Sequence, residues 1–426
     1  MGSVKVAVAV IGAGAAGLMA ARELKREGHG VRVFEKSGKV GGIWVYDHRV
    51  DSDDPILGEE IQLQVHNSMY LSLRTNLPRP LMGFSDFPLT EESHYGDPRM
   101  FPGHREVLSF LNHFVAEYGL LDLIRFNTEV VLVESILTEN GRRWVVDAVA
   151  SGGIYSKDVF DAVVICNGHV TVPRLPHIPG LEKWPGKQTH SHNYRVPEPF
   201  KDEVVVILGN GASAYDISRD IAKVAKEVHL SSRSPLAKLS RLNAYPNIWL
   251  HSGVVCANGD GKVTFQDGSA VHADTMLHCT GYNYDHSFLK TNGIITIDDN
   301  RVGPLYKHVF PPDLSPGLSF VGLPHKTILF LMMELQSRWI AQVLSSKVSL
   351  PSKENMIADI DCYFRQMEEL KRPIHQTHFL FNPEEFGYLD WIAQQVGSPP
   401  VEKWKKEMYR KVIKQIECHD DEFRDD

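Results

Sequence analysis

The sequence lacks three features that would narrow its function at once: paired cysteines, a long apolar run and an excess of basic residues. Its cysteines are scattered and none forms a Cys-x-x-Cys pair, so we expect reduced thiols of an intracellular protein and no disulfide framework. They are Cys166, Cys256, Cys279, Cys362 and Cys418. No run is long enough to cross a bilayer. A formal net charge of -8 gives no general attraction to nucleic acid or to an anionic membrane.

These absences predict a cytoplasmic protein that binds neither nucleic acid nor a membrane, and they leave a homodimer open. What is present is the composition of an ordinary globular enzyme, with 43% hydrophobic and 23% charged residues. At 426 residues the chain is too long for one ordinary domain and long enough for two.

The first chemical motif is a glycine-rich turn near the N-terminus. An apolar strand over residues 4–11 leads into Gly12-Ala13-Gly14-Ala15-Ala16-Gly17, a helix to about Arg26 and a strand over residues 30–35. The first glycine permits the tight turn, the second lets the backbone approach a diphosphate, and the third lets helix and strand pack closely. Glu35, at the end of the second strand, is placed to accept hydrogen bonds from a ribose diol. We therefore expect a dinucleotide site here.

A second copy of the pattern follows later in the chain. The strand of residues 203–208 leads into Gly209-Asn210-Gly211-Ala212-Ser213-Ala214, a helix to about Ala225 and a strand over residues 227–232. That strand ends in Ser231-Ser232-Arg233 and has no acid, and hydroxyls with a guanidinium suit a 2′-phosphate. This favours NADPH over NADH, although Arg233 could instead be a solvated surface charge.

The repeat predicts an α/β fold with two Rossmann-like, dinucleotide-binding domains. We expect the NADPH domain, residues 170–282, to be inserted into a discontinuous FAD domain of residues 1–169 and 283–426. The crossings follow strands at residues 162–166 and 275–278, and helices are expected around residues 334–344, 356–370 and 400–416. Two sites of opposite 2′ preference imply electron passage from NADPH to a held flavin. Because no cysteine pair follows Glu35, the electrons are expected to go to oxygen or to a bound small molecule.

Several segments together resemble the flavin-containing monooxygenases, and most closely the plant S-oxygenating branch typified by the glucosinolate S-oxygenases. The most specific is residues 184–194, which fits the pattern FxGxxxHxxxY with Trp184 in place of Phe. Baeyer-Villiger relatives end this pattern with Trp, whereas this chain has Tyr194-Arg195. The other segments are the Glu35 to Trp44 stretch with its GGxW pattern, Leu73 to Arg79, Phe101 to His104, Cys279 to Tyr282, and Glu334 to Ser337.

The resemblance implies that NADPH reduces FAD, that oxygen adds to give a flavin C4a-hydroperoxide, and that one oxygen atom passes to a soft nucleophile. The expected reaction is S-oxygenation of a small thioether, such as a glucosinolate side chain or an S-substituted cysteine, to a sulfoxide. N-oxygenation of an amine remains an alternative with the same cofactors. An uncoupled NADPH oxidase is an alternative of a different class.

The resemblance also suggests site residues. Asn76 is the expected catalytic residue beside the flavin, although asparagine before a proline-containing loop is also common in turns. Further cofactor contacts are expected from Lys36, Gly42, Trp44, Thr75, Leu77, Val130, Thr280 and Gln336. No metal is expected, because neither the His190 and His192 pair nor the His375 and His378 pair has a third ligand at zinc spacing.

Overall fold

The computed structural model describes residues 4–49, 65–90, 96–139, 141–233, 239–380, 384–418 and 423–424. The chain forms two compact units. Unit 1 comprises residues 1–45, 77–169 and 284–426, and unit 2 comprises residues 46–76 and 170–283. Residues 46–76 therefore group with the inserted unit, whereas the sequence had placed all of residues 1–169 in the first domain.

Unit 1 is built on a parallel sheet in the order β22-β7-β1-β2-β3. Its strands are β1 (Ala7–Ile11), β2 (Gly30–Phe34), β3 (Ile124–Arg125), β7 (Ala162–Ile165) and β22 (Leu318–Phe320). An antiparallel sheet of β4 (Thr128–Thr138), β5 (Gly141–Ala150) and β6 (Ile154–Phe160) packs on one face, where Trp144 and Val146 join Ala9 and Val163 in one core. Because β1 is covered on both sides, its residues are almost all buried.

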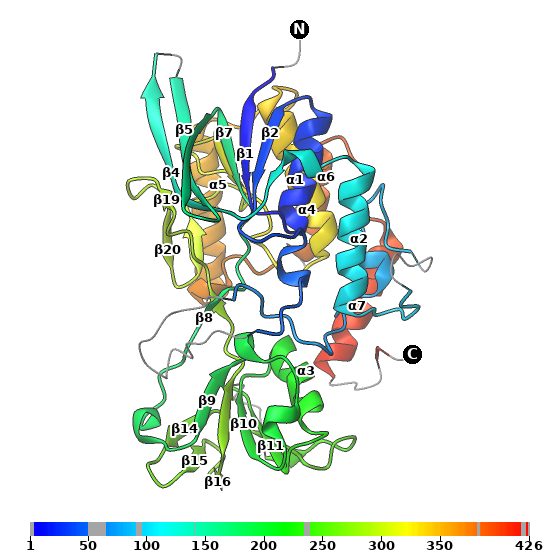
Figure 1. Cartoon of the computed structure of the whole chain (residues 1–426), viewed down its shortest axis with the longest axis vertical. Coiled ribbons are helices and arrows are strands. Elements are labelled where there is room, and N and C mark those ends of the chain that lie inside the picture. The colour runs from blue at the N-terminus through cyan, green and yellow to red at the C-terminus, as the bar shows by residue number, and fades with distance from the viewer. Residues whose placement is uncertain are drawn as a thin grey trace. The chain divides into compact units, whose positions relative to one another are not determined.

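Helices cover the other face of this sheet, where α1 (Ala15–Arg26) lies along α4 (Leu329–Leu344) (Figure 1). The remaining helices of unit 1 are α2 (His104–Glu117), α5 (Lys353–Glu369), α6 (Glu384–Gln395) and α7 (Lys403–Glu417). The three helices expected in the last third of the chain thus correspond to α4, α5 and α7. The sequence had not indicated α6. No helix within the described ranges is both long and apolar enough to span a membrane.

Unit 2 repeats the arrangement around the second glycine turn. Its sheet has the order β12-β13-β11-β10-β17-β9. The strands are β9 (Lys187–His190), β10 (Val204–Leu208), β11 (Glu227–Ser231), β12 (Ser240–Arg241), β13 (Ile248–His251) and β17 (Thr275–His278). Helix α3 (Ala212–Ile221) packs on one face through Ile217. A small sheet of β14 (Val254–Ala257), β15 (Lys262–Phe265) and β16 (Ala270–His272) covers the opposite face through Phe265.

Candidate cofactor and active site

The glycines of the first turn are required by close backbone packing. Gly12 has a φ of +105°, and a Cβ there would lie 2.5 Å from the carbonyl oxygen of Cys166. A Cβ on Gly17 would lie 1.9 Å from the carbonyl oxygen of Gly12, so only glycine lets α1 begin this close to β1. At Gly14 a Cβ would meet only Gly42 at an ordinary 3.6 Å. The need for glycine at position 14 therefore does not come from the protein's own packing.

Glu35 closes this turn from the end of β2. One oxygen of its buried carboxylate accepts a 2.8 Å hydrogen bond from the Ala13 amide, and the other accepts one of 2.8 Å from the Ser37 amide. The neighbouring Lys36 has a lowered pKa, chiefly because burial disfavours the ammonium. The structure thus brings Glu35 to the glycine turn, as the sequence motif requires.

The start of α1 suits a diphosphate. Its first turn has no acidic residue and its N-cap, Gly14, makes no side-chain capping bond. Helices α2 and α5 instead carry Glu106 and Glu354 in their first turns. A helix N-terminus without its own carboxylate leaves room for an anion beside its positive end. These residues therefore fit the diphosphate and ribose of a dinucleotide.

Two of the other predicted cofactor contacts of unit 1, Gln336 and Gly42, lie near the same turn. Gln336 is fully buried, and its side-chain oxygen accepts a 2.9 Å bond from the amide of Gly322, which packs against Ala16. Its amide nitrogen donates to the Tyr388 hydroxyl at 2.7 Å. Gln336 thus supports the loop beside α1 through Gly322. Of the remaining residues, Gly42 lies against Gly14, Trp44 ends a short 3-10 turn, Leu77 is buried and Val130 is half-buried on β4.

The second glycine turn has the same close backbone packing at its first glycine, but it differs from the first turn at its third position. Gly209 has a φ of +118°, and its Cβ would lie 2.4 Å from the carbonyl oxygen of Cys279. Ala214 replaces the third glycine and is fully buried, so the close approach at Gly17 has no counterpart. A Cβ on Gly211 would meet nothing within 4 Å. Since Gly211 starts α3, whose first turn also lacks acids, the open space there fits a second diphosphate.

Residues that the sequence did not single out hold the predicted 2′-phosphate site. Ser232 donates its amide to the carbonyl of His251 at 3.0 Å, and Ser231 donates its hydroxyl to the carbonyl of Ser252 at 3.1 Å. Asp267 in turn accepts the amide of Ser252 at 3.1 Å. Burial lowers the pKa of His251 to about 4, so its ring is neutral. Arg233 itself is exposed and able to meet a phosphate. No sequence spacing links these segments.

The fingerprint segment is structural within unit 2. Trp184 lies over Gly186, where a Cβ would come 2.2 Å from the indole ring, which explains why an aromatic residue and a glycine recur at this spacing. His190 lies 3.1 Å from the carbonyl of Gly281 through Nε2 and receives the His192 amide on Nδ1 at 3.0 Å. Tyr194 donates its hydroxyl to Asp220 at 2.7 Å. The fingerprint therefore fixes the segment that holds Thr280, whose hydroxyl donates to the carbonyl of Arg174.

Arg195, directly after the fingerprint, explains why residues 46–76 belong to unit 2. Its buried guanidinium donates to the carbonyls of Asp47 at 2.6 Å and Asn67 at 2.7 Å. In the same segment Thr75 is buried and Asn76 is exposed. Asn76 and Leu77 thus fall on different units. The role of Asn76 stays a prediction.

Among the described residues, no group of three or more His, Cys, Asp or Glu could hold a metal ion. The two cysteines nearest the glycine turns are buried. Burial raises the pKa of Cys279 to about 12 and raises that of Cys166 as well, so both thiols are protonated. Neither has the thiolate character of a redox-active cysteine.

Two dinucleotide-binding folds without a redox-active cysteine pair indicate a flavin enzyme that passes electrons to oxygen or to a bound small molecule. The family described as flavin-binding monooxygenase-like matches residues 5–256 and 247–404, and the chain belongs to this family. It is a monooxygenase that uses FAD and NADPH.

Individual relatives are similar over nearly their whole length. The chain is 50% identical to the flavin-containing monooxygenase FMO GS-OX-like 1 of Arabidopsis thaliana, covering 98% of this chain and 92% of the relative. It is 52% identical to FMO GS-OX5 of the same plant, covering 98% and 91%. The structure of S-allyl-L-cysteine S-oxygenase from Allium sativum superimposes with a TM-score of 0.95 at 49% identity, covering 100% of this chain and 96% of that one. Cyclohexanone monooxygenase from Rhodococcus sp. Phi1 shares the fold alone, with a TM-score of 0.61 and 15% identity.

Proposed function

We propose that the protein oxygenates the sulfur of a small thioether to a sulfoxide, consuming one O₂, one NADPH and one proton and releasing water and NADP⁺. The observation that carries this proposal is the likeness, over the entire chain, to a solved S-allyl-L-cysteine S-oxygenase. The GS-OX relatives support the same branch.

We assign FAD to unit 1 and NADPH to unit 2. The turn from Gly12 to Gly17 and the start of α1 would hold the FAD diphosphate, and Glu35 would accept the ribose hydroxyls. The turn from Gly209 to Ala214 would hold the NADPH diphosphate, with Ser232 and Arg233 on the 2′-phosphate. Asn76 is proposed to position the reacting groups.

When bound, the two cofactors supply the activation of dioxygen, which is chemistry that no side chain provides. A thioether attacks through a neutral sulfur lone pair and needs no deprotonation. The protein therefore has to bind, orient and exclude water rather than supply a general base. The protonated, buried thiols of Cys166 and Cys279 are consistent with a route that does not pass through protein sulfur.

The test is product analysis with the purified holoenzyme, NADPH, air and S-allyl-L-cysteine, with a tertiary amine in parallel. We expect sulfoxide in near-stoichiometric ratio to the NADPH consumed. Predominant amine N-oxide would favour the alternative activity. Release of one hydrogen peroxide per NADPH with every substrate would refute a monooxygenase reaction on these compounds.

A further inference from the structure

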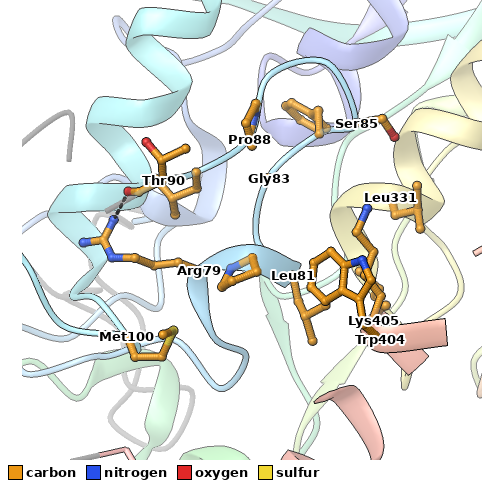
Figure 2. A pocket seen from close by; sticks show the side chains of 14 residues that line it. Arg79, Leu81, Gly83, Ser85, Pro88, Thr90, Met100, Leu331, Trp404 and Lys405 are labelled. Carbon is orange, nitrogen blue, oxygen red and sulfur yellow. Dashed lines mark hydrogen bonds between the residues drawn. The ribbon is translucent and has the colours of Figure 1, made fainter. Parts of the chain in front are cut away.

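Unit 1 contains a cavity of about 320 Å³ whose lining residues, apart from Arg79, lie outside the sequence motifs (Figure 2). It lies between residues 79–90, the first turn of α4 and the first turn of α7. This volume is at the lower end of the range for small-molecule sites. Most of its wall is apolar, with contributions from Leu81, Phe84, Leu89, Met100, Leu331 and Trp404.

The charged groups of the wall are of one sign. The residues that line the cavity, all in the described ranges, include the cations Arg79 and Lys405 and no acid. Arg79 is fully engaged elsewhere, because its guanidinium donates to the carbonyls of Arg99 at 2.7 Å and Thr90 at 3.0 Å and pairs with Glu106 at 3.1 Å. Figure 2 shows it directed at Thr90, away from Trp404.

Lys405 is the cation able to serve a ligand. Its side chain is only 18% exposed, and it forms an ion pair with Glu402 at 2.5 Å. Glu402 is 54% exposed and does not line the cavity, so its carboxylate is largely hydrated, whereas the Lys405 ammonium is not. A ligand carboxylate inside the cavity can therefore compete with Glu402 for Lys405. The N-terminus of α4 has no acid at its N-cap, Ile328, or in its first turn, which further favours an anion here.

The cavity is also linked by sequence to the predicted flavin contacts. Leu77 lies two residues before Arg79, and Gln336 lies on α4 after Leu331. Both segments that carry these predicted contacts in unit 1 also form walls of the cavity.

We infer that this cavity binds the substrate, and that Lys405 makes the enzyme select thioethers bearing an anionic group over cationic amines. The inference rests on the proposed S-oxygenation. The apolar wall takes the alkyl thioether, and Lys405 pairs with a carboxylate or a sulfate ester. A protonated amine is repelled by the same charge, so the selection also favours sulfur over nitrogen chemistry.

The experiment compares thioethers that share an allylthio group on a three-carbon chain and carry an anionic, a neutral or a cationic end: 3-(allylthio)propanoate, 3-(allylthio)propanamide and 3-(allylthio)propylamine. With the wild-type holoenzyme we expect the KM to be lowest for the carboxylate and highest for the amine. Lys405→Gln should raise the KM for the carboxylate about tenfold, as for loss of a partly buried charged contact, with kcat little changed. The KM for the amide should change less than about twofold. Adding 2-(allylthio)ethyl sulfate tells which anion is preferred.

Three further variants test the role of Lys405 separately from that of the cavity volume. Lys403→Gln removes the same charge from α7 at a side chain that is 90% exposed and outside the wall, so it should not alter the preference. Glu402→Gln frees Lys405 and should lower the KM for the carboxylate. Leu331→Trp fills the cavity and should raise the KM for carboxylate and amide alike.

Calorimetric binding of the three compounds without oxygen and NADPH separates the two proposals. If no sulfoxide forms from any thioether, the proposed function fails. The order of the three binding affinities still tests whether the cavity selects anionic ligands. The inference is overturned if Lys405→Gln shifts all three compounds equally, if Lys403→Gln acts as Lys405→Gln does, or if the amine binds best.

Discussion

At the scale of single residues, the glycines of the two turns have different roles: some are needed for folding, and one is needed for binding the nucleotide. We expect Gly211→Ala to fold normally, because its backbone φ is -86° and the added methyl meets nothing within 4 Å. Its affinity for NADP⁺ should fall at least about tenfold, since the methyl would stand where the diphosphate approaches the backbone. Gly209→Ala should instead lower the melting temperature, because its φ is +118° and the methyl meets the Cys279 carbonyl. Equal melting shifts in the two variants would contradict this division.

Arg233 tests the nucleotide preference. Arg233→Ala should reduce kcat/KM for NADPH about tenfold or more and leave that for NADH within about twofold, because only NADPH has the 2′-phosphate. Arg241→Ala is the matched control, since this exposed arginine lies over Trp249, 3.7 Å from the ring centroid, on the same sheet. A parallel loss with both nucleotides would remove Arg233 from the 2′-phosphate site.

At the scale of elements, the sequence predicted best where a motif constrained it. Strands β1 and β10 and the start of α1 lie where the apolar runs and glycine turns indicated. Helix α3 ends at Ile221, before the expected Ala225, because Val224 bonds back to Ile221 in a tighter turn. The antiparallel sheet β4 to β6 was missed. Both faces of β5 are buried, which hides its alternation, although Ser151-Gly152-Gly153 is a turn signal between β5 and β6.

What the sequence could not predict depends on contacts distant along the chain. Arg195 bonds residues 128 and 148 positions away, and the Ser232 site is supported by Asp267 through Ser252. Such contacts have no regular spacing along the sequence, so no sequence pattern predicts them. The same holds for Lys405, which joins residues 79–90 in one cavity wall only once the chain has folded.

Glu334 joins helix α4 to the segment around Ser85. It is fully buried on α4, accepts the Ser85 amide at 2.8 Å and pairs with Arg338 at 2.7 Å. Glu334→Ala removes both contacts and leaves Arg338 with the more distant Glu23 carboxylate, at 3.5 Å, so it should lower the free energy of unfolding by about 3 kcal/mol, measured by urea denaturation. Glu407→Ala, at an exposed pair on α7, should change it little. A comparable change in both variants would show that the Ser85 segment does not depend on Glu334.

At the scale of the whole molecule, unit 1 contains a cluster of buried and half-buried histidines, defined as His169, His286, His308, His325 and His378. Burial is the main cause of a lowered pKa in each: about 4 for the first two, about 3 for the next two, and well below 6.5 for His378. Mutual repulsion and nearby lysines lower several further, and only Asp285 and a backbone carbonyl act in the opposite direction.

The hydrogen bonds require neutral rings at the centre of this cluster. His378 accepts the Val302 amide on Nε2 at 3.1 Å, so its proton is on Nδ1 and is donated to Nδ1 of His308 at 3.1 Å. A second proton on His378 would oppose the Val302 amide. Protonation of this pair therefore requires the core to open.

Stability should accordingly depend on pH. Unfolded histidines bind a proton below about pH 6.5 whereas the folded cluster does not, so the unfolded state binds more protons between about pH 6.5 and 4. The free energy of unfolding should fall as the pH drops through this window, by up to about 3 kcal/mol per histidine. Urea denaturation at pH 7.5, 6.5, 5.5 and 4.5 measures it, and His308→Gln should flatten the slope whereas His48→Gln, at a ring 85% exposed, should not. A pH-independent midpoint would mean that the cluster takes up protons while folded. The pair of bonds at His378 argues against that result, because the ring has no nitrogen left to carry the added proton without losing one of them.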